Sequence, residues 1–412
     1  MNIFLGAYAC EPHKGSEPEV GWQMANEIAK VMPDDNIYVI TKYNNQDLIE
    51  KENYPSNVKF FYYDPPKWLT FWKKGGRGVR TYYYIWMFTA ALFMKKQNIK
   101  FDIVHHVTFV NDWLPSFYHL LKTKQNKFVW GPIGSHEGIQ AKFLDGNKRK
   151  LIEKIRMFLQ FFYRTIDPSF HTCKSKADCI VGITQNVRSK LNLDTKKMFI
   201  AEPAIAMNKS ILNDIKKPKK NHENFIILSV GRLLYIKNFK LTILSFSYFL
   251  KNNPHVDNAK LKIIGKGSDR KSLENFTKEL GIENKVEFIG EIPRKEVQEN
   301  FYNANLFLFP TLESAGFVTL EAMSNYLPVV AMKYGGPQEF IKHYAEEQLV
   351  SYEQSYKSIA NDLAKKIEIF YLDEKVCDRV AEQNHQDVVD NFTWEAKAQK
   401  MKKLYLDLTN ET

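Results

Sequence analysis

The sequence predicts an α/β protein with two doubly wound, parallel-sheet domains. The chain has 412 residues, whereas a single hydrophobic core rarely serves more than about 250–300 residues. Short apolar runs alternate with helical patterns, which is the order of βαβ units in a parallel sheet. This order restarts after a polar, lysine-rich segment at 207–224, whose composition suits an interdomain linker. We therefore expect one domain over 1–205 and a second over 206–390.

The strands of the first domain are expected where short runs are rich in apolar, β-branched or aromatic residues. These runs are 2–9, 37–41, 58–63, 102–107, 127–130 and 178–182. A loop at 10–21 follows the first strand and precedes a helix through Trp22 and Ile28.

The second domain repeats the pattern, with a helix near 238–251. Its expected strands are 225–230, 260–264, 286–289, 306–309 and 328–332. Open parallel sheets bind ligands outside the carboxyl ends of their strands. We therefore expect the functional residues in the loops 10–17, 105–112, 231–238, 265–269, 290–295 and 310–317.

Composition and charge narrow the class of protein. The apolar fraction is 44% and the charged fraction 25%, which is ordinary for a globular protein and argues against a disordered chain. The net charge of +11 favours an anionic partner, which could be nucleic acid, an anionic membrane surface or a phosphate-bearing substrate. A solvated basic surface would also explain this charge.

The cysteines and the N-terminus bear on the compartment. None of the four cysteines has the spacing of a redox pair or a zinc site; they are Cys10, Cys173, Cys179 and Cys377. We expect reduced, buried thiols, as in a cytosolic protein. The chain opens with a strand-like run and has neither a signal-peptide pattern nor an apolar stretch of about 18 residues or more. The expected location is the cytoplasm, or the inner face of the plasma membrane with peripheral attachment.

Residues 310–323, PTLESAGFVTLEAM, carry the strongest functional signal. A strand runs into a loop that holds Glu313, Gly316 opens a helix, and Glu321 lies inside that helix. A helix N-terminus favours an anion, so the two carboxylates could flank a ligand whose phosphate sits at Gly316. By spacing alone, the two glutamates could also be ordinary surface residues.

This segment resembles the EX7E signature of the retaining glycosyltransferases of family 4, which have the GT-B fold. Four more segments match in the family's order, and they are 229–238 (SVGRLLYIKN), 261–268 (LKIIGKGS), 286–290 (VEFIG) and 335–339 (GGPQE). Three segments of the first half, 9–22, 104–108 and 130–134, resemble one branch of the family more loosely. The resemblance implies a glycosyltransferase whose second domain binds the donor. It also implies that residues 391–412 pack back on the first domain.

The resemblance implies roles for the charged residues of the second domain. Arg232 and Lys237 would hold the donor diphosphate and stabilise the leaving group as charge develops. Glu313 would contact the hydroxyls of the transferred sugar, and Glu321 would accept hydrogen bonds from the ribose hydroxyls.

Glycines and backbone groups complete the expected donor-binding set. Backbone N–H groups near Gly316, Phe317 and Val318 would bind phosphate or sugar, and the stretch from Phe288 to Gly290 would lie beside the base. The remaining members come from the family's glycine loops, and they are Gly15, Ser16 and Gly265.

His105 and His106 end an expected strand of the first domain, where the family often has a histidine near the acceptor and the sugar. Adjacent residues of a strand point to opposite faces, so we expect only one of the two to face the cleft. The sequence leaves open which one, and either could equally be a structural histidine.

The donor and the chemistry follow from the same resemblance. Ala315 stands where the family usually has a bulky residue, so the identity of the transferred sugar is not specified. UDP is the favoured nucleotide of the donor, and GDP is the alternative. No Asp-x-Asp motif is present, in keeping with GT-B enzymes, so we expect neither a metal nor a cofactor. The implied reaction is retaining transfer, in which the leaving diphosphate deprotonates the acceptor hydroxyl.

Two stretches of the first domain combine basic and aromatic residues. Residues 65–101 hold eight Lys or Arg and ten aromatics but no Asp or Glu, and 141–176 hold nine basic and three acidic residues. This mixture suits an anionic membrane surface or single-stranded nucleic acid. A buried aromatic helix with a solvated basic rim is the third interpretation. We favour the membrane, because no nucleic-acid motif accompanies the charge.

The leading hypothesis is a glycosyltransferase that acts on a glycan or a lipid-linked acceptor to build a surface polysaccharide or glycolipid. One rival is a nucleotide-sugar epimerase on the same fold, although that class is not expected to carry the EX7E segment. The other rival is a catalytically silent membrane scaffold, against which the intact Glu313, Arg232, Lys237 and Glu321 argue.

Overall fold

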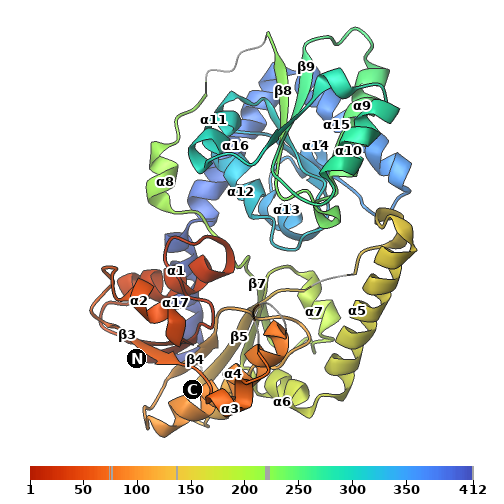
Figure 1. The fold of residues 1–412 in the computed structure, drawn as a ribbon. Coiled ribbons are helices and arrows are strands. Elements are labelled where there is room, and N and C mark those ends of the chain that lie inside the picture. Colours follow the sequence, from red (N-terminus) through yellow and green to blue (C-terminus); the bar gives the residue numbers. More distant parts are fainter. Residues whose placement is uncertain (74, 76–77, 136–137, 219–222, 411–412) are drawn as a thin grey trace. The chain divides into compact units, whose positions relative to one another are not determined.

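The computed structural model describes residues 1–73, 75, 78–135, 138–218 and 223–410 (Figure 1). The chain forms two compact units. The first contains Met1–His136, Lys154–Ile205 and Trp394–Thr412, and the second contains Glu137–Glu153 and Ala206–Thr393. The expected boundary near residue 205 coincides with a unit boundary, but 137–153, which we placed in the first domain, are counted with the second. The reason lies in contacts such as that of Lys142, whose Nζ donates to the carbonyl of Tyr352 over 2.5 Å.

The first unit is built on a seven-stranded parallel sheet in the order β3-β2-β1-β4-β5-β6-β7. Its strands are β1 (Asn2–Gly6), β2 (Asn36–Lys42), β3 (Val58–Tyr63), β4 (Ile103–His106), β5 (Lys127–Ile133), β6 (Cys179–Gly182) and β7 (Met198–Ala201). The six expected strands are confirmed. The sequence did not predict β7, an edge strand whose residues are only partly buried.

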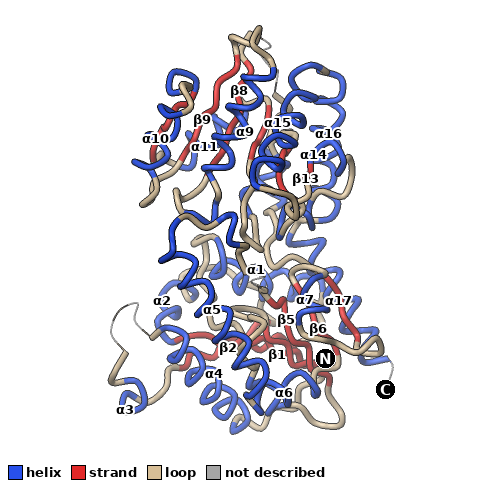
Figure 2. The backbone as a smooth tube through the Cα atoms, turned by 90° about the vertical axis from the view of Figure 1, so that its right-hand side faces the viewer, coloured by secondary structure: helices blue, strands red, loops and turns tan. Residues whose placement is uncertain are grey.

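Helices lie on both faces of this sheet. The helices of this unit are α1 (Ser16–Val31), α2 (Gln46–Ile49), α3 (Lys67–Thr70), α4 (Val79–Lys96), α6 (Pro168–Lys176), α7 (Asn186–Lys190) and α17 (Trp394–Asn410), together with α5 (Gly146–Ile166), which both units share. Figure 2 shows α1 and α17 on one side of the strands, with α4 and α6 on the other. The expected loop at 10–21 is wrong at its end, because α1 begins at Ser16. Its first turn carries Glu17 and Glu19, which the helix dipole favours.

The alternation of side chains along the strands separates two layers of core. Phe4 of β1, Val104 of β4 and Phe128 of β5 belong to a buried cluster with Trp86 and Met87 of α4. The α4 stretch is therefore the buried aromatic helix that was one interpretation of residues 65–101. All four cysteines of the chain are free and buried.

The second unit is built on a six-stranded parallel sheet in the order β10-β9-β8-β11-β12-β13. Its strands are β8 (Phe225–Val230), β9 (Ala259–Ile264), β10 (Val286–Gly290), β11 (Leu306–Leu308), β12 (Val329–Met332) and β13 (Leu349–Val350). The five expected strands are confirmed, and the two-residue β13 was not predicted.

The helices of the second unit connect these strands. They are α8 (Lys209–Asp214), α9 (Phe239–Asn252), α10 (Arg270–Glu279), α11 (Arg294–Asn303), α12 (Phe317–Ser324), α13 (Gly335–Phe340), α14 (Ala345–Gln348), α15 (Tyr356–Leu372) and α16 (Glu374–Asn391). The helix α8 lies in the stretch that we interpreted as a linker, of which residues 219–222 fall outside the described residues.

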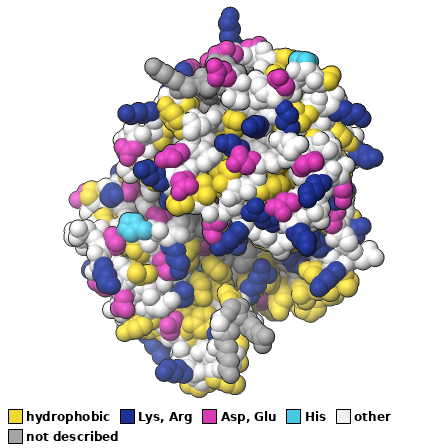
Figure 3. Space-filling view, turned by 45° about the horizontal axis from the view of Figure 1, so that its top comes forward, with side chains coloured by type: hydrophobic (Ala, Val, Ile, Leu, Met, Phe, Trp, Pro, Cys, Tyr) yellow, Lys and Arg dark blue, Asp and Glu magenta, His cyan; other side chains and the backbone are white. Residues whose placement is uncertain are grey.

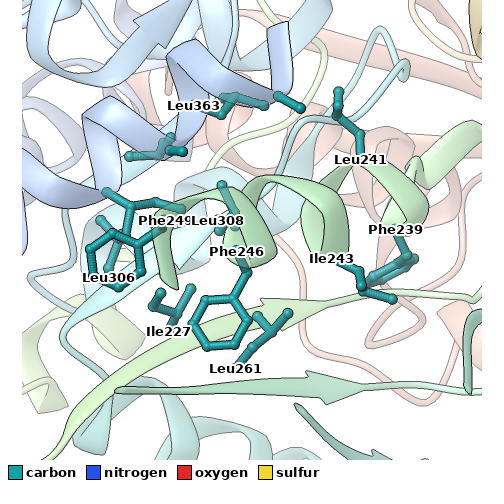
Figure 4. Packing of buried hydrophobic residues seen from close by; sticks show 14 of the residues in the cluster. Ile227, Phe239, Leu241, Ile243, Phe246, Phe249, Leu261, Leu306, Leu308 and Leu363 are labelled. Carbon is teal, nitrogen blue, oxygen red and sulfur yellow. The ribbon is translucent and has the colours of Figure 1, made fainter. Parts of the chain in front are cut away.

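The core of the second unit is centred on α9. Phe246 and Phe249 of this helix are fully buried with Ile227 of β8 and Leu261 of β9 (Figure 4). Leu363 of α15 packs into the same cluster. This packing fixes α9 and the loop that precedes it, which leads directly from the carboxyl end of β8.

Candidate functional site

Glycines line the carboxyl edge of the second sheet where three neighbouring strands end. Gly265 donates its backbone N–H to the carbonyl of Gly290 over 2.7 Å, and Gly231 donates to the carbonyl of Ile264 over 2.9 Å. A Cβ atom on Gly265 would lie 1.9 Å from the carbonyl oxygen of Gly231, so this position cannot hold a side chain. The edge is therefore bare backbone, which a ligand can approach closely.

The loop from β8 to α9 carries both predicted cations. Arg232 is exposed, and the next residue, Leu233, donates its N–H to the carbonyl of Lys266 over 2.9 Å. Lys237 ends a 3-10 turn, and Asn238 then adopts the left-handed conformation with φ 56°. The Asn238 Nδ2 donates to the carbonyl of Pro310 over 3.0 Å. The β8–α9 loop is thus tied to the loop that follows β11.

Lys237 and Glu313 are brought together by this arrangement. The Lys237 ammonium forms an ion pair with the Glu313 carboxylate, and both side chains are largely buried. The same ammonium lies 5.2 Å from the centre of the Phe309 ring. A desolvated cation beside a carboxylate can exchange that partner for an anionic ligand.

The helix α12 begins beside this ion pair. Gly316 is its N-cap in the left-handed conformation, with φ 62°, and Phe317 and Val318 form its first turn. The first N–H groups of a helix have no intrahelical partner and favour an anion. Two glycines pack closely against this loop. A Cβ on Gly335 would lie 2.1 Å from the carbonyl oxygen of Glu313, and a Cβ on Gly336 would lie 2.2 Å from the carbonyl oxygen of Ala315.

Glu321 lies in the middle of α12 with its carboxyl partly buried. Burial raises the pKa of this carboxyl to about 7, although Arg294 and Lys237 act in the opposite direction. Glu321 is therefore near Lys237, the cation that pairs with Glu313, and a shifted pKa is typical of functional sites.

Arg294 is a residue that the sequence prediction missed. It is exposed at the first position of α11, after the loop that follows β10. Glu291 and Glu296 flank it in the sequence, and only the fold brings it near Glu321. Its position in the loop 290–295, one of the expected functional loops, was the signal in the sequence that could have identified it.

Phe288 and Gly290 occupy the end of β10, and both are partly buried. The carbonyl of Phe288 accepts a hydrogen bond from Arg270 Nη2 over 3.1 Å, and the Arg270 guanidinium lies 6.0 Å from the Phe288 ring. The structure thus places Arg232, Lys237, Gly265, Phe288, Gly290, Gly316, Phe317, Val318, Glu313 and Glu321 in one unit and at one sheet edge.

Four predicted site residues belong to the first unit instead. Gly15 has φ 68° and caps α1, and Ser16 is the first residue of that helix. His105 and His106 are the last two residues of β4, at the end of the strand where they were expected.

Neither histidine is open to solvent in the first unit, which favours the structural role that the sequence left open for each. His105 shares hydrogen bonds with the Tyr405 hydroxyl and the Gly131 carbonyl, both over 2.6 Å. His106 shares one with the Tyr83 hydroxyl over 2.8 Å, on the opposite face of the sheet. Burial lowers the pKa of His105 to about 4 and that of His106 to about 3. Both are neutral, hydrogen-bonded core residues in this structure.

A cavity of about 480 Å³ lies beside the predicted edge, between the start of α9, α10 and residues 142–149. Four of its charged side chains form two ion pairs, since Lys240 pairs with Asp145 over 3.1 Å and Arg149 with Asp269 over 2.9 Å. It shares only the β8–α9 loop with the candidate site. Within the described part of the chain, no group of three or more His, Cys, Asp or Glu side chains is arranged to hold a metal ion.

The second half of the chain is similar to known proteins. The family described as "Glycosyl transferases group 1" matches residues 210–387. An uncharacterized glycosyltransferase of Methanocaldococcus jannaschii is 30% identical over 181 residues, which are 44% of this chain and 44% of that protein. The phosphatidylinositol N-acetylglucosaminyltransferase gpi3 subunit of Schizosaccharomyces pombe is 24% identical over 243 residues, 58% of this chain and 48% of that protein. The chain spans less than half the length of these two curated relatives.

The whole chain is similar in fold to HepE of Anabaena, a structure determined in complex with UDP. The TM-score is 0.61 at 15% identity, and the likeness covers 98% of this chain and 99% of that one. At this identity the likeness concerns the fold alone. The fold is GT-B, with two Rossmann-like domains, as the sequence predicted.

Proposed function

We propose, on the premise that residues 210–387 match the family described as "Glycosyl transferases group 1", that the chain transfers a sugar from a nucleotide sugar to a glycan or lipid-linked acceptor. One observation carries the proposal. Lys237, Glu313 and Glu321 gather at the carboxyl edge of the second sheet, beside the N-terminus of α12. That is where an open parallel sheet binds its ligand.

In the proposed complex the cations bind the donor diphosphate. Lys237 exchanges part of its pairing with Glu313 for a phosphate oxygen, and Arg232, which is exposed at the same edge, supplies the second charge. The first N–H groups of α12 add hydrogen bonds. Together these groups stabilise the negative charge that grows on the leaving diphosphate.

The carboxylates orient the two sugars of the donor. Glu313 accepts hydrogen bonds from the hydroxyls of the transferred sugar, and Glu321 accepts them from the ribose. Phe288 and Gly290, at the end of the neighbouring strand β10, lie beside the base. UDP is the nucleotide we favour, in keeping with the UDP in the structure of the similar HepE, and GDP is the alternative.

The proposed reaction retains the configuration of the transferred sugar. The bond from the anomeric carbon to the diphosphate oxygen breaks, and the acceptor oxygen bonds to the same face of that carbon. The proton of the acceptor hydroxyl passes to the departing diphosphate, so no side chain has to act as a base. The charge on the leaving group is balanced by Arg232 and Lys237, and we propose that no metal or cofactor takes part. We also propose a cytoplasmic location, which the free, buried cysteines support.

A titration of the purified chain with UDP, GDP and ADP tests the donor site. We expect UDP to bind, GDP to bind more weakly and ADP least, with EDTA leaving the affinities unchanged. Failure of all three nucleotides to bind would remove the assignment, and a loss of binding in EDTA would contradict the metal-free site.

The class of reaction needs a separate measurement. With UDP-sugars and an acceptor mixture, transfer releases UDP and labels the acceptor, whereas an epimerase would convert the sugar and label nothing. A silent scaffold would do neither while still binding UDP. We expect UDP release that depends on the acceptor.

A further inference from the structure

The helix α5 has its apolar side on the outside. Nine large apolar residues of this one helix are exposed, and they are Leu151, Ile152, Ile155, Phe158, Leu159, Phe161, Phe162, Tyr163 and Ile166. Phe158 is 64% and Phe161 62% exposed. Monomeric soluble proteins rarely expose a continuous apolar surface of this kind unless it binds something.

Some polar side chains of α5 point inward and hold it in this orientation. Arg164 Nη1 lies 2.8 Å from Oδ2 of Asp112, a residue that is only 1% exposed. Glu153 is buried and accepts the backbone N–H of Ile139 over 2.7 Å, and Gln160 is buried as well. Turning the helix to hide its phenylalanines would break these contacts. The arrangement excludes, for this helix, the buried aromatic helix with a basic rim that was one interpretation of residues 141–176.

The exposed charged side chains of α5 itself have one sign. Residues 154–166 contain no Asp or Glu, the buried Glu153 is the acidic residue of α5, and Lys148 and Lys154 of the helix are exposed. A second exposed apolar group lies in the same unit at α3, where Trp68 and Phe71 stand beside Lys67.

Side-chain contacts connect α5 to α4, which lies between α3 and α5 in the sequence. The Tyr84 hydroxyl of α4 donates to Asp167, just after α5, over 3.4 Å. The Trp113 ring lies 5.6 Å from that of Tyr163 and 4.9 Å from the guanidinium of Arg80. Figure 3 shows apolar side chains, in yellow, with dark-blue Lys and Arg among them along the lower part of the molecule.

We propose that the outward face of α5 docks on the surface of a lipid bilayer that contains anionic lipid. The apolar side chains enter the interface while Lys148 and Lys154 meet the lipid phosphates. In the part of the chain that the structure describes, no helix is long and apolar enough to cross a bilayer, so α5 lies in the plane of the surface. A second copy of the chain suits the face less well, because pairing it with itself would bring like charges together.

Flotation of the full chain with vesicles tests the proposal without any nucleotide, so it can fail while donor binding holds. We expect binding to vesicles of phosphatidylcholine with phosphatidylglycerol, and much weaker binding to phosphatidylcholine alone or in high salt. The proposal would be overturned if the folded wild-type chain does not bind anionic vesicles at low salt.

Matched variants identify the face. The change Phe158→Ser, alone and with Phe162→Ser, should weaken vesicle binding by about tenfold or more, since each removes a large side chain from the apolar phase. The control is Leu372→Ser, because Leu372 is also 64% exposed but ends α15 in the second unit. Equal binding by the phenylalanine variants and the control would refute the assignment of the face.

The charge component has its own control. The pair Lys148→Gln and Lys154→Gln should lower the affinity for anionic vesicles by roughly tenfold, whereas Lys251→Gln with Lys260→Gln, two exposed lysines of the second unit, should not. The proposal is wrong if the wild-type chain forms a dimer in lipid-free buffer, the Phe158→Ser variant is monomeric, and neither protein binds vesicles. The face would then join two copies of the chain.

Discussion

Lys237 and Glu313, which are 76 positions apart in the sequence, form an ion pair at the carboxyl edge of the second sheet. In the proposed complex a diphosphate competes with Glu313 for this lysine. The change Lys237→Ala should therefore weaken UDP binding by about 2 kcal/mol, roughly 30-fold, the contribution of a charged hydrogen bond. Isothermal titration calorimetry measures the effect. The control is Lys260→Ala, because Lys260 lies at the amino end of β9, away from the carboxyl ends of the strands.

Glu313→Gln should have the opposite effect on the nucleotide. It frees Lys237 and removes a negative charge near the diphosphate, so UDP should bind as tightly as before or a few-fold more tightly, while sugar transfer is lost. If UDP binding instead falls as far as in the lysine variant, the ion pair serves to hold the two loops together rather than to exchange partners.

The carboxyl of Glu321 should make stability depend on pH. Its pKa is about 7 in the folded chain, against an ordinary value of 4.5. The folded state therefore holds a proton that the unfolded state releases, so stability is lost as pH rises from about 4.5 through about 7. The loss is at most about 3 kcal/mol.

The change Glu321→Gln should abolish this dependence. The variant and the wild type should melt at similar temperatures near pH 5, and the variant should melt higher near pH 8. Scanning calorimetry across this range is the measurement. A constant difference at every pH would mean that burial does not raise the pKa of Glu321.

Gly335→Ala should destabilise the site more than strain alone explains. Gly335 has φ 58°, and an added Cβ would lie 2.1 Å from the carbonyl oxygen of Glu313. Gly281 has φ 68° but open space around it, so Gly281→Ala isolates the cost of the left-handed backbone, about 1 kcal/mol. We expect Gly335→Ala to cost about 3 kcal/mol and to weaken UDP binding, because the Glu313 loop has to move. Equal melting temperatures of the two variants would disprove the clash.

A buried ion pair should hold α17 in the first unit. Lys397 Nζ lies 3.0 Å from Glu202 Oε1, and both side chains are almost fully buried. Burial alone would raise the pKa of Glu202, but Lys397 and Lys400 outweigh it and lower that pKa. Lys397→Met should cost about 3–5 kcal/mol, since it leaves a buried carboxylate with a weaker partner.

The double change Lys397→Met with Glu202→Gln should recover much of the loss, because no buried charge then remains. Thermal unfolding of the three proteins measures this. A double variant as unstable as Lys397→Met would show that packing, rather than charge, determines the effect.

The sequence predicted the strands well because buried parallel strands are short, continuous apolar runs. The expected ranges 58–63 and 225–230 coincide with β3 and β8 at both ends. The start of α1 was missed because Glu17, Pro18 and Glu19 are common both in loops and in the first turn of a helix. The edge strand β7 was missed because its residues are only half buried.

The site was predictable where the residues follow one another closely in the sequence. Glu313, Gly316 and Glu321 share one segment, and Lys237 came from a motif. The proximity of Arg294 to Glu321 was not predictable, because it depends on β10 and β11, which lie on opposite sides of β9 and β8 in the strand order of the sheet. The burial of both histidines was one of two alternatives that the sequence left open, since alternation shows that they face opposite sides but not that helices cover each side.

The outward apolar face of α5 has a practical consequence for work with the purified protein. The ion pair between Arg164 and Asp112 fixes the orientation of α5. The helix therefore cannot turn to bury its exposed phenylalanines without breaking this pair. In buffer without lipid or detergent, the protein would then aggregate, adsorb to surfaces or be retained on columns because the apolar face of α5 is in contact with water. An oligomer size measured under such conditions should be repeated with a mild detergent before it is assigned to the molecule itself.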